Sequence, residues 1–423
     1  MGAGSGSPRL GVSLHCRPLP LDWPRDLEFP DQCPLGAARQ TALGMPFSVY
    51  LHFPYCRNKC SYCDFYKELY DPEHERRFYE ALFTETRLRG ESWPSEDRII
   101  TSIFVGGGTP SLTRLDLLAR WLEELKRHFT VLEGLEFSIE NNPESVTLEL
   151  LESYKELGIN RPTFGIQSFK PKLLKLLNRK HSIRDSQRAV YLTNALRFEN
   201  FGADLIFALP RQTSRMLTED LDQLIELEPP HISFYQLTIE PGTPLAEKMA
   251  RGKLKPVDED LTYAMYRGGC EKLAEAGYVR YEVSSFAKPG HECRHNISYW
   301  EGQDYLAFGP SGHSFVHGRR FANVASVNDY IISLQRGEYP VEEDESGVAE
   351  RMVEAIMLGL RMTRGIDRRQ FAERFGHNVE DQLDRRQYEI LIESGYIIPD
   401  RGRIRLSETG FFLADEITRR LIR

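Results

Sequence analysis

The amino-acid sequence predicts an α/β protein: a partial (β/α)6 TIM-like barrel followed by a smaller α+β domain that resembles a winged helix. Three observations support this. From residue 46 to about residue 237, short apolar runs alternate with helical periods. Several of the runs end in glycine-rich or polar segments, which is where functional sites lie in parallel α/β folds. Beyond residue 341, helical segments and one hairpin-like stretch replace the alternation.

The barrel is predicted from six apolar runs with helices between them. The runs span residues 49–53, 99–105, 135–140, 163–166, 203–209 and 232–237. The first helix opens at Asp71-Pro72, an N-cap followed by a first-turn proline. A second helix carries leucines at the spacing of one helix face from Leu115 to Leu125, and a third closes at Gly158. Strands and helices in series predict a parallel sheet that curls toward a barrel.

The rest of the chain is predicted to extend the barrel and then to form a separate domain. A long helix covers about residues 258–276, and the acidic, proline-containing stretch 337–347 is predicted to be a linker. Three helices (349–361, 368–375 and 379–394), a hairpin-like stretch (396–406) and a last helix (409–422) follow. We therefore divide the chain into an N-terminal extension (1–45), a core (46–280), a core extension (281–340) and a C-terminal domain (341–423).

Composition excludes several classes of partner. The 423 residues carry a net charge of −8, which does not favour binding to nucleic acid or to an anionic membrane. No run of about 18 apolar residues occurs, so no membrane span is predicted. Residues 1–44 contain acids such as Asp22 and Glu28, which disfavours a mitochondrial transit peptide. They are predicted to be a mobile extension, or an over-long start with the true initiator at Met45.

Three cysteines in one short loop are the strongest chemical signal. Cys56, Cys60 and Cys63 follow the first apolar run. Three thiolates at this spacing can hold three corners of a [4Fe–4S] cluster, and the fourth iron would lack a protein ligand because the next cysteine is Cys270. A structural zinc site usually has four ligands in paired spacing, and buried inert cysteines are the other alternative. The spacing favours the cluster, and free cysteines indicate a reducing compartment.

These motifs together resemble the radical S-adenosylmethionine superfamily. The resemblance rests on the cysteine loop, on Gly106–Pro110 and on polar residues at strand ends. It is closer to the branch of the anaerobic coproporphyrinogen-III oxidases, also called dehydrogenases, and closest to the HemW heme-chaperone family. It covers about residues 46–423. Phe65 stands where true oxygen-independent coproporphyrinogen dehydrogenases typically carry a further cysteine.

The resemblance implies cofactors and contacts. Cys56, Cys60 and Cys63 would hold a [4Fe–4S] cluster, whose open iron would bind S-adenosylmethionine. The implied contacts to this cosubstrate are Tyr50, Gly107, Gly108, Thr109, Glu140, Gln167, Arg179 and Asp204. The glycines permit close approach of the backbone, and the guanidinium of Arg179 suits a carboxylate. Glu140, Gln167 and Asp204 are expected at the ends of separate strands.

A second motif, His295-Asn296-x-x-Tyr299-Trp300, is predicted to bind heme. A lone histidine is more often a hydrogen-bonded structural residue than a ligand. Beside Tyr299 and Trp300, however, His295 offers an axial nitrogen next to flat apolar faces, and the HemW-like family links this motif with heme. His313 and Cys293 are weaker candidates.

The expected function is that of a heme chaperone, which binds heme and passes it to acceptor apo-hemoproteins. The alternative is an oxygen-independent coproporphyrinogen III dehydrogenase of heme biosynthesis. No residue is assigned a catalytic role, and the sequence does not decide whether the chain is an enzyme. The expected partners are heme, the acceptors and an electron donor, with no nucleic acid; a homodimer and peripheral membrane contact stay open. Bacterial cytoplasm is the expected compartment, with the mitochondrial matrix as the alternative.

Overall fold

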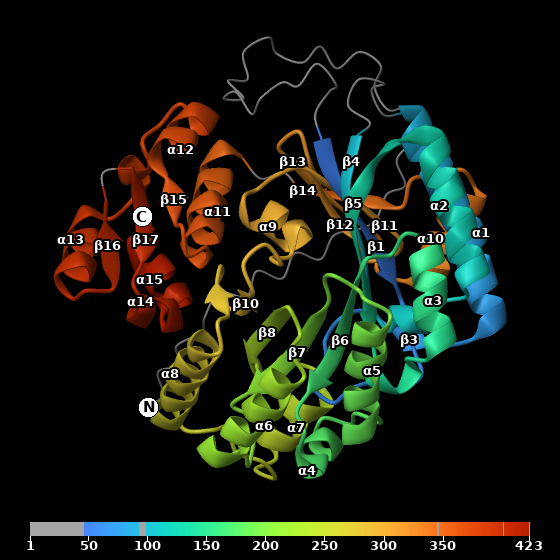
Figure 1. Cartoon of the computed structure of the whole chain (residues 1–423). Helices are drawn as coiled ribbons and strands as arrows, with labels where there is room; N and C mark the ends of the chain where they lie inside the picture. Colours follow the sequence, from blue (N-terminus) through green and yellow to red (C-terminus); the bar gives the residue numbers. More distant parts are fainter. Residues whose placement is uncertain (1–45, 93–98, 345–346, 401, 423) are drawn as a thin grey trace, which may run out of the picture.

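A computed structural model describes residues 46–92, 99–344, 347–400 and 402–422 (Figure 1). The extension predicted for residues 1–45 lies outside the described residues. No helix in the described part of the chain has the length and apolar character that a membrane span needs.

Six parallel strands form the centre of a sheet that has twelve strands in the described residues. They are β1 (Pro46–Phe53), β4 (Ile99–Gly107), β5 (Thr130–Asn141), β6 (Arg161–Gln167), β7 (Gly202–Phe207) and β8 (His231–Gln236). Each strand overlaps one predicted apolar run, and each pairs in parallel with the next. The predicted fold class, an α/β partial barrel followed by a smaller α+β domain, is confirmed.

Helices cover the outer face of the curved sheet (Figure 1). They are α1 (Pro72–Ser92), α2 (Leu115–His128), α3 (Leu148–Glu156), α4 (Pro171–Leu176), α5 (Ile183–Ala195), α6 (Ser214–Glu226), α7 (Pro244–Ala250) and α8 (Glu259–Glu275). Strand residues alternate: Phe137 and Ile139 join the hydrophobic core with the helices, whereas Ser138 and Glu140 face the inside of the barrel. We call this inner space the lumen. Its polar lining sets it apart from the apolar outer layer.

The sheet continues past the six central strands. At one edge are β9 (Val279–Arg280) and β10 (Ser285–Ala287), and at the other are β11 (Tyr305–Phe308), β12 (His313–Val316), β13 (Arg319–Asn323) and β14 (Val341–Asp344). The prediction of a linker at 337–347 is wrong, because β14 pairs with β13 in this sheet. Charged residues and prolines are common at sheet edges, so composition does not separate an edge strand from a linker.

The C-terminal domain is a small α+β unit. It contains α11 (Val348–Arg361), β15 (Ile366–Asp367), α12 (Arg368–Phe375), α13 (Arg385–Glu393), β16 (Ile397–Pro399), β17 (Arg403–Leu406), α14 (Glu408–Phe412) and α15 (Ala414–Leu421). Two predicted helices are each split. Asp384 accepts a bond from the Gln387 N–H at 2.8 Å and caps α13, so the helix cannot run through from 379. The last helix is interrupted at Leu413.

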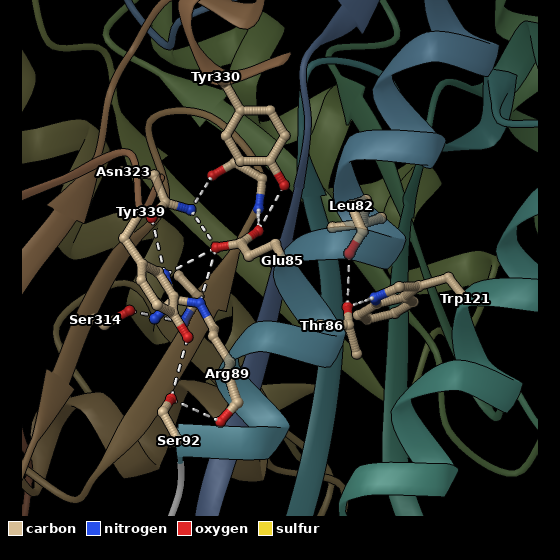
Figure 2. Close-up of polar contacts among 12 residues, drawn as sticks. Leu82, Glu85, Thr86, Arg89, Ser92, Trp121, Ser314, Asn323, Tyr330 and Tyr339 are labelled. Atoms are coloured by element: carbon tan, nitrogen blue, oxygen red, sulfur yellow. Dashed lines mark hydrogen bonds and ion pairs between the residues drawn. The ribbon is translucent and has the colours of Figure 1, made fainter. Parts of the chain in front are cut away.

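A buried polar network fastens α1 to the added strands (Figure 2). The Glu85 carboxylate is fully buried and accepts bonds from Arg89 at 2.8 Å, Asn323 at 2.8 Å and Tyr330 at 2.6 Å. The Gly309 N–H donates to the same carboxylate at 3.0 Å. Glu85 therefore connects α1 with β13, with the turn after β11 and with α10 (Val327–Gln335).

Candidate metal centre

The three cysteines lie at the carboxyl end of β1, and each sulfur faces a hydrogen-bond donor. Thr109 Oγ1 donates to Cys56 Sγ at 3.3 Å, and Lys67 Nζ donates to Cys63 Sγ at 3.2 Å. Arg179 Nη1 lies 3.7 Å from Cys60 Sγ. Burial raises the pKa of the Cys56 thiol, and the bond from Thr109 acts against that rise. Two cations and one hydroxyl thus face the three sulfurs as hydrogen-bond donors.

Neighbouring elements hold this loop in place. Ser61 donates its backbone N–H to the Leu177 carbonyl at 3.0 Å, and Asn178 Nδ2 donates to the Lys59 carbonyl at 2.8 Å. On the other side, the Gly108 N–H donates to the Phe53 carbonyl at 2.7 Å. A Cβ at Gly108 would lie 2.5 Å from the Tyr55 carbonyl oxygen, so this position requires glycine.

The three cysteines are compatible with an iron–sulfur cluster. Within the described residues, no three His, Cys, Asp or Glu side chains converge on one point that could hold a metal ion. In a [4Fe–4S] cluster each cysteine binds a different iron, so the sulfurs need not meet at one point. The zinc alternative, which needs a closed tetrahedral set, gains no support.

Acidic side chains from two strands reach the lumen beside this loop. Glu140 of β5 accepts a bond from the Gly107 N–H at 3.2 Å. Burial, with the nearby Asp204 charge, raises the pKa of Glu140 to about 8. Burial also raises the pKa of Asp204 to about 6. Asp204 is the third residue of β7, so its predicted place at a strand end is wrong, although its side chain still belongs to the same electrostatic group.

Gln167 ends β6 with an unusual backbone conformation. Its φ is 66°, in the left-handed region that non-glycine residues seldom adopt. Asp220 of α6 holds the next turn, because Ser168 Oγ donates to it at 2.6 Å and the Phe169 N–H at 3.0 Å. The Gln167 Oε1 atom is buried and has no hydrogen-bond partner among the described residues. A donor group of a bound ligand would satisfy this oxygen.

Tyr50 and Arg179 border the same region, since Tyr50 interacts electrostatically with Glu140 and Arg179 with Asp204. Tyr50 Oη lies 3.3 Å from His52 Nδ1, and the Tyr50 ring stacks on Phe104 at 6.3 Å. Arg179 Nη2 donates to the Gly165 carbonyl at 2.7 Å, which places its guanidinium between β6 and Cys60. The structure thus gathers the predicted cosubstrate contacts at the carboxyl ends of the strands and in the adjacent lumen. His52 and Asp220, which support these contacts, were not predicted.

The His295 motif forms a separate group, carried by α9 (Arg294–Trp300), and α9 lies well apart from α4 in Figure 1. Glu136 of β5 accepts bonds from the N–H groups of Arg294 and His295, both at 2.9 Å, and so neutralises the start of this helix. The His295 ring stacks on Phe104 at 5.2 Å. Phe104 therefore lies between the ring of Tyr50 and that of His295 and connects the two groups.

Both ring nitrogens of His295 have partners. Ser102 Oγ donates to Ser48 Oγ at 2.9 Å, so it accepts from the His295 Nδ1–H at 2.8 Å. The Nε2 atom therefore carries a lone pair, which accepts the Tyr299 hydroxyl proton at 2.7 Å. His295 is 1% exposed, and burial lowers its pKa to about 3, so the ring is neutral. Trp300 lies beside Arg361, whose guanidinium carbon is 5.6 Å from the indole ring centre.

The raised pKa of Glu140 predicts a pH-dependent effect of the Glu140→Gln substitution. Because the folded-state pKa of about 8 exceeds the ordinary value of 4.5 for a glutamate, ionisation of Glu140 destabilises the fold progressively as pH rises between these two values. We expect Glu140→Gln to raise the free energy of unfolding by about 2–4 kcal/mol at pH 8 and hardly at all at the acidic end of the window. Urea denaturation at both pH values measures this. An equal gain in the free energy of unfolding at both pH values, or a decrease at pH 8, would contradict the raised pKa of Glu140.

The chain is similar to known proteins over most of its length. The radical SAM superfamily matches residues 50–224, and the HemN C-terminal domain matches residues 348–413. The heme chaperone HemW of Haemophilus influenzae is 34% identical over 380 residues, which are 88% of this chain and 97% of the relative. The chain belongs to the HemW family. The HemW of Bacillus subtilis is 32% identical over 372 residues, with the same coverage of each chain.

A solved structure agrees on the fold of this HemW-family chain. The coproporphyrinogen III oxidase HemN of Escherichia coli, a radical SAM enzyme, superposes with a TM-score of 0.78 and covers 89% of this chain and 90% of its own. At 21% identity it shows the fold alone. Membership in the radical SAM superfamily implies a [4Fe–4S] cluster and S-adenosylmethionine, and the donors around the three sulfurs and the unmatched Gln167 oxygen fit these groups.

Proposed function

We propose that this protein binds heme and transfers it to acceptor apo-hemoproteins, while it carries a [4Fe–4S] cluster on Cys56, Cys60 and Cys63. The HemW relatives that it matches over nearly their whole length are named heme chaperones. Support for the cluster comes from the donors that face each sulfur, Thr109, Lys67 and Arg179. Acceptor proteins and an electron donor are the partners that this function requires.

The proposal assigns S-adenosylmethionine to the carboxyl ends of the strands. The residues that would hold it are Tyr50, Gly107, Gly108, Thr109, Glu140, Gln167, Arg179 and Asp204. Gln167 Oε1 offers an unmatched acceptor, and the Glu140 and Asp204 carboxyls offer acceptors for hydroxyl or ammonium groups. Arg179 already contacts the cysteine loop and suits a carboxylate. When bound, the cluster and cosubstrate supply one-electron chemistry.

Heme is proposed to bind at His295, Tyr299 and Trp300. This step rests on the Nε2 lone pair of His295. The imidazole ring is neutral, and the only partner of Nε2 within the described residues is the Tyr299 hydroxyl. Neutral imidazole is the form that ligates iron. For Nε2 to bind iron, the Tyr299 hydroxyl must move away from it. The hydrogen bond from Nδ1 to Ser102 keeps the proton on Nδ1, so Nε2 stays unprotonated.

Titration with heme tests the proposed ligand. We expect His295→Ala to weaken heme binding at least about tenfold, since it removes an axial ligand. Tyr299→Phe removes the hydroxyl that competes for Nε2, so it is expected to bind heme at least as tightly as the wild type. His377→Ala, at an exposed histidine of the C-terminal domain, is the control and should leave the affinity unchanged. Wild-type affinity in His295→Ala would refute this ligand.

A further inference from the structure

A strongly basic surface borders the cysteine loop of this acidic protein. From Lys170 to Arg184 the chain has six lysines and arginines and no acidic residue, although the whole chain has a net charge of −8. We define the α4 basic surface by five exposed side chains from this segment and from the cysteine loop: Arg57, Lys59, Lys175, Lys180 and Arg184.

We propose that the α4 basic surface is the docking site of an acidic electron-transfer protein that reduces the cluster. This inference rests on the proposed function, because it requires a cluster on Cys56, Cys60 and Cys63. The reduced donor gives one electron to the oxidised cluster; the donor is thereby oxidised by one electron, and no bond is made or broken in the transfer.

One acid, Glu144, lines a hollow that Arg57 and Lys180 also line, but it forms no ion pair with either of them. Within the described residues, none of the five side chains forms an ion pair; Lys180 donates only to the neutral Asn178 side chain, at 3.1 Å. Asp185, the first acid after the segment, accepts a bond from the Ser182 N–H in the capping box of α5 and pairs with Arg188 at 3.0 Å. A cluster of like charges on the surface costs free energy through repulsion, and an acidic partner would remove that cost.

The surface leads directly to a cluster ligand. A hollow of about 470 Å³ is lined by Lys175, Arg179, Lys180 and Arg184 among other residues. A neighbouring hollow shares Arg179 and Lys180 with it and is lined also by Arg57 and Cys60. Cys60 is half-buried on this side, and Arg179 contacts its sulfur. A donor seated here would bring its redox group to the edge of the cluster.

Exposed apolar side chains beside the cysteine loop offer a contact surface for such a partner. Phe65 is 65% exposed and Leu69 is 63% exposed, which are unusually high fractions for large apolar residues. Apolar contact at the centre of an interface with a charged rim is the usual arrangement in transient complexes. Complementary charge would raise the association rate and make it depend on salt.

The test compares a charge-reversed protein with a matched control. The variant Lys175→Glu/Lys180→Glu/Arg184→Glu changes the α4 basic surface. The control Arg87→Glu/Lys126→Glu/Arg127→Glu makes the same change of charge at exposed positions of α1 and α2. The probe is a reduced plant-type [2Fe–2S] ferredoxin, an acidic one-electron carrier. Stopped-flow absorbance follows reduction of the reconstituted cluster, and fluorescence titration measures ferredoxin binding to the cluster-free protein.

We expect the variant to lose at least about tenfold in both the ferredoxin reduction rate and the affinity at low salt, with no change in reduction by dithionite. The control variant should match the wild type. Equal behaviour of both variants toward ferredoxin would overturn the proposal. The proposal would also be overturned if the α4 variant lost binding to phosphatidylserine vesicles but kept its binding to ferredoxin. That result would make the surface a membrane-binding site. Cluster absorbance and heme affinity, measured on the same samples, reveal separately any failure of the proposed function.

Discussion

Replacement of Cys60 by alanine is expected to abolish assembly of the iron–sulfur cluster. Three thiolates are the minimum set that holds a cubane with one open iron, so two remaining cysteines leave a second iron without a ligand. Arg179, which faces the Cys60 sulfur at 3.7 Å, would also lose its partner there. After anaerobic reconstitution with iron and sulfide, we expect the iron content and the broad visible absorbance to fall to about a tenth of the wild type or less.

Cys270→Ser is the matched control for this experiment. Cys270 is a half-buried thiol of α8, far along the chain from the loop, where Arg280 and Tyr266 surround it. Burial raises the pKa of this thiol to about 11, as expected for an inert cysteine. This control should reconstitute like the wild type. Undiminished absorbance in Cys60→Ala would contradict the assigned ligand set.

Glu85→Ala is expected to cause the largest loss of stability. The carboxylate is fully buried and accepts four bonds, from Arg89, Asn323, Tyr330 and the Gly309 N–H. Its removal leaves the Arg89 guanidinium buried without its ion-pair partner, which costs about 3–5 kcal/mol. Urea denaturation followed by circular dichroism measures the change in free energy of unfolding.

Glu80→Ala, on the same helix, is the control. It removes a carboxylate from α1 without disturbing the network around Glu85. Glu80 is exposed, so its replacement should change stability by less than about 0.5 kcal/mol. Figure 2 shows Glu85 where α1 meets Asn323 of β13 and Tyr330 of α10. A loss below about 1 kcal/mol in Glu85→Ala would mean that the network contributes little to the fold.

Much of the fold follows from periodicity that is visible in the sequence. The six central strands were predictable because each buries one face against helices, so its apolar run stands out between helical periods. The split at Asp384 and the pairing of β14 depend on capping and on a neighbouring strand, which composition does not show. The cap at Asp384 is a local hydrogen bond that apolar periodicity does not register, whereas β14 is decided by its pairing with β13.

The same distinction between local motifs and long-range contacts applies to the candidate site. The cysteine loop is a local motif, so its residues could be named from the sequence. Arg179 becomes a partner of Cys60 only through the fold, whereas Lys67 lies four residues after Cys63 and its local contact was missed. Asp220 could have been noticed as an acid on the apolar face of α6, between Leu217 and Leu221. Its role in holding the turn after Gln167 needed the structure.

Transfer of heme from this protein to an acceptor can be measured in a single assay. Reconstituted protein loaded with one equivalent of heme is mixed with an apo-hemoprotein, and the Soret band is followed as the acceptor fills. A parallel sample receives coproporphyrinogen III, S-adenosylmethionine and a reductant, and is analysed for vinyl products. We expect heme transfer to the acceptor and no decarboxylated product. Vinyl products without heme transfer would contradict this expectation and make this chain a coproporphyrinogen dehydrogenase.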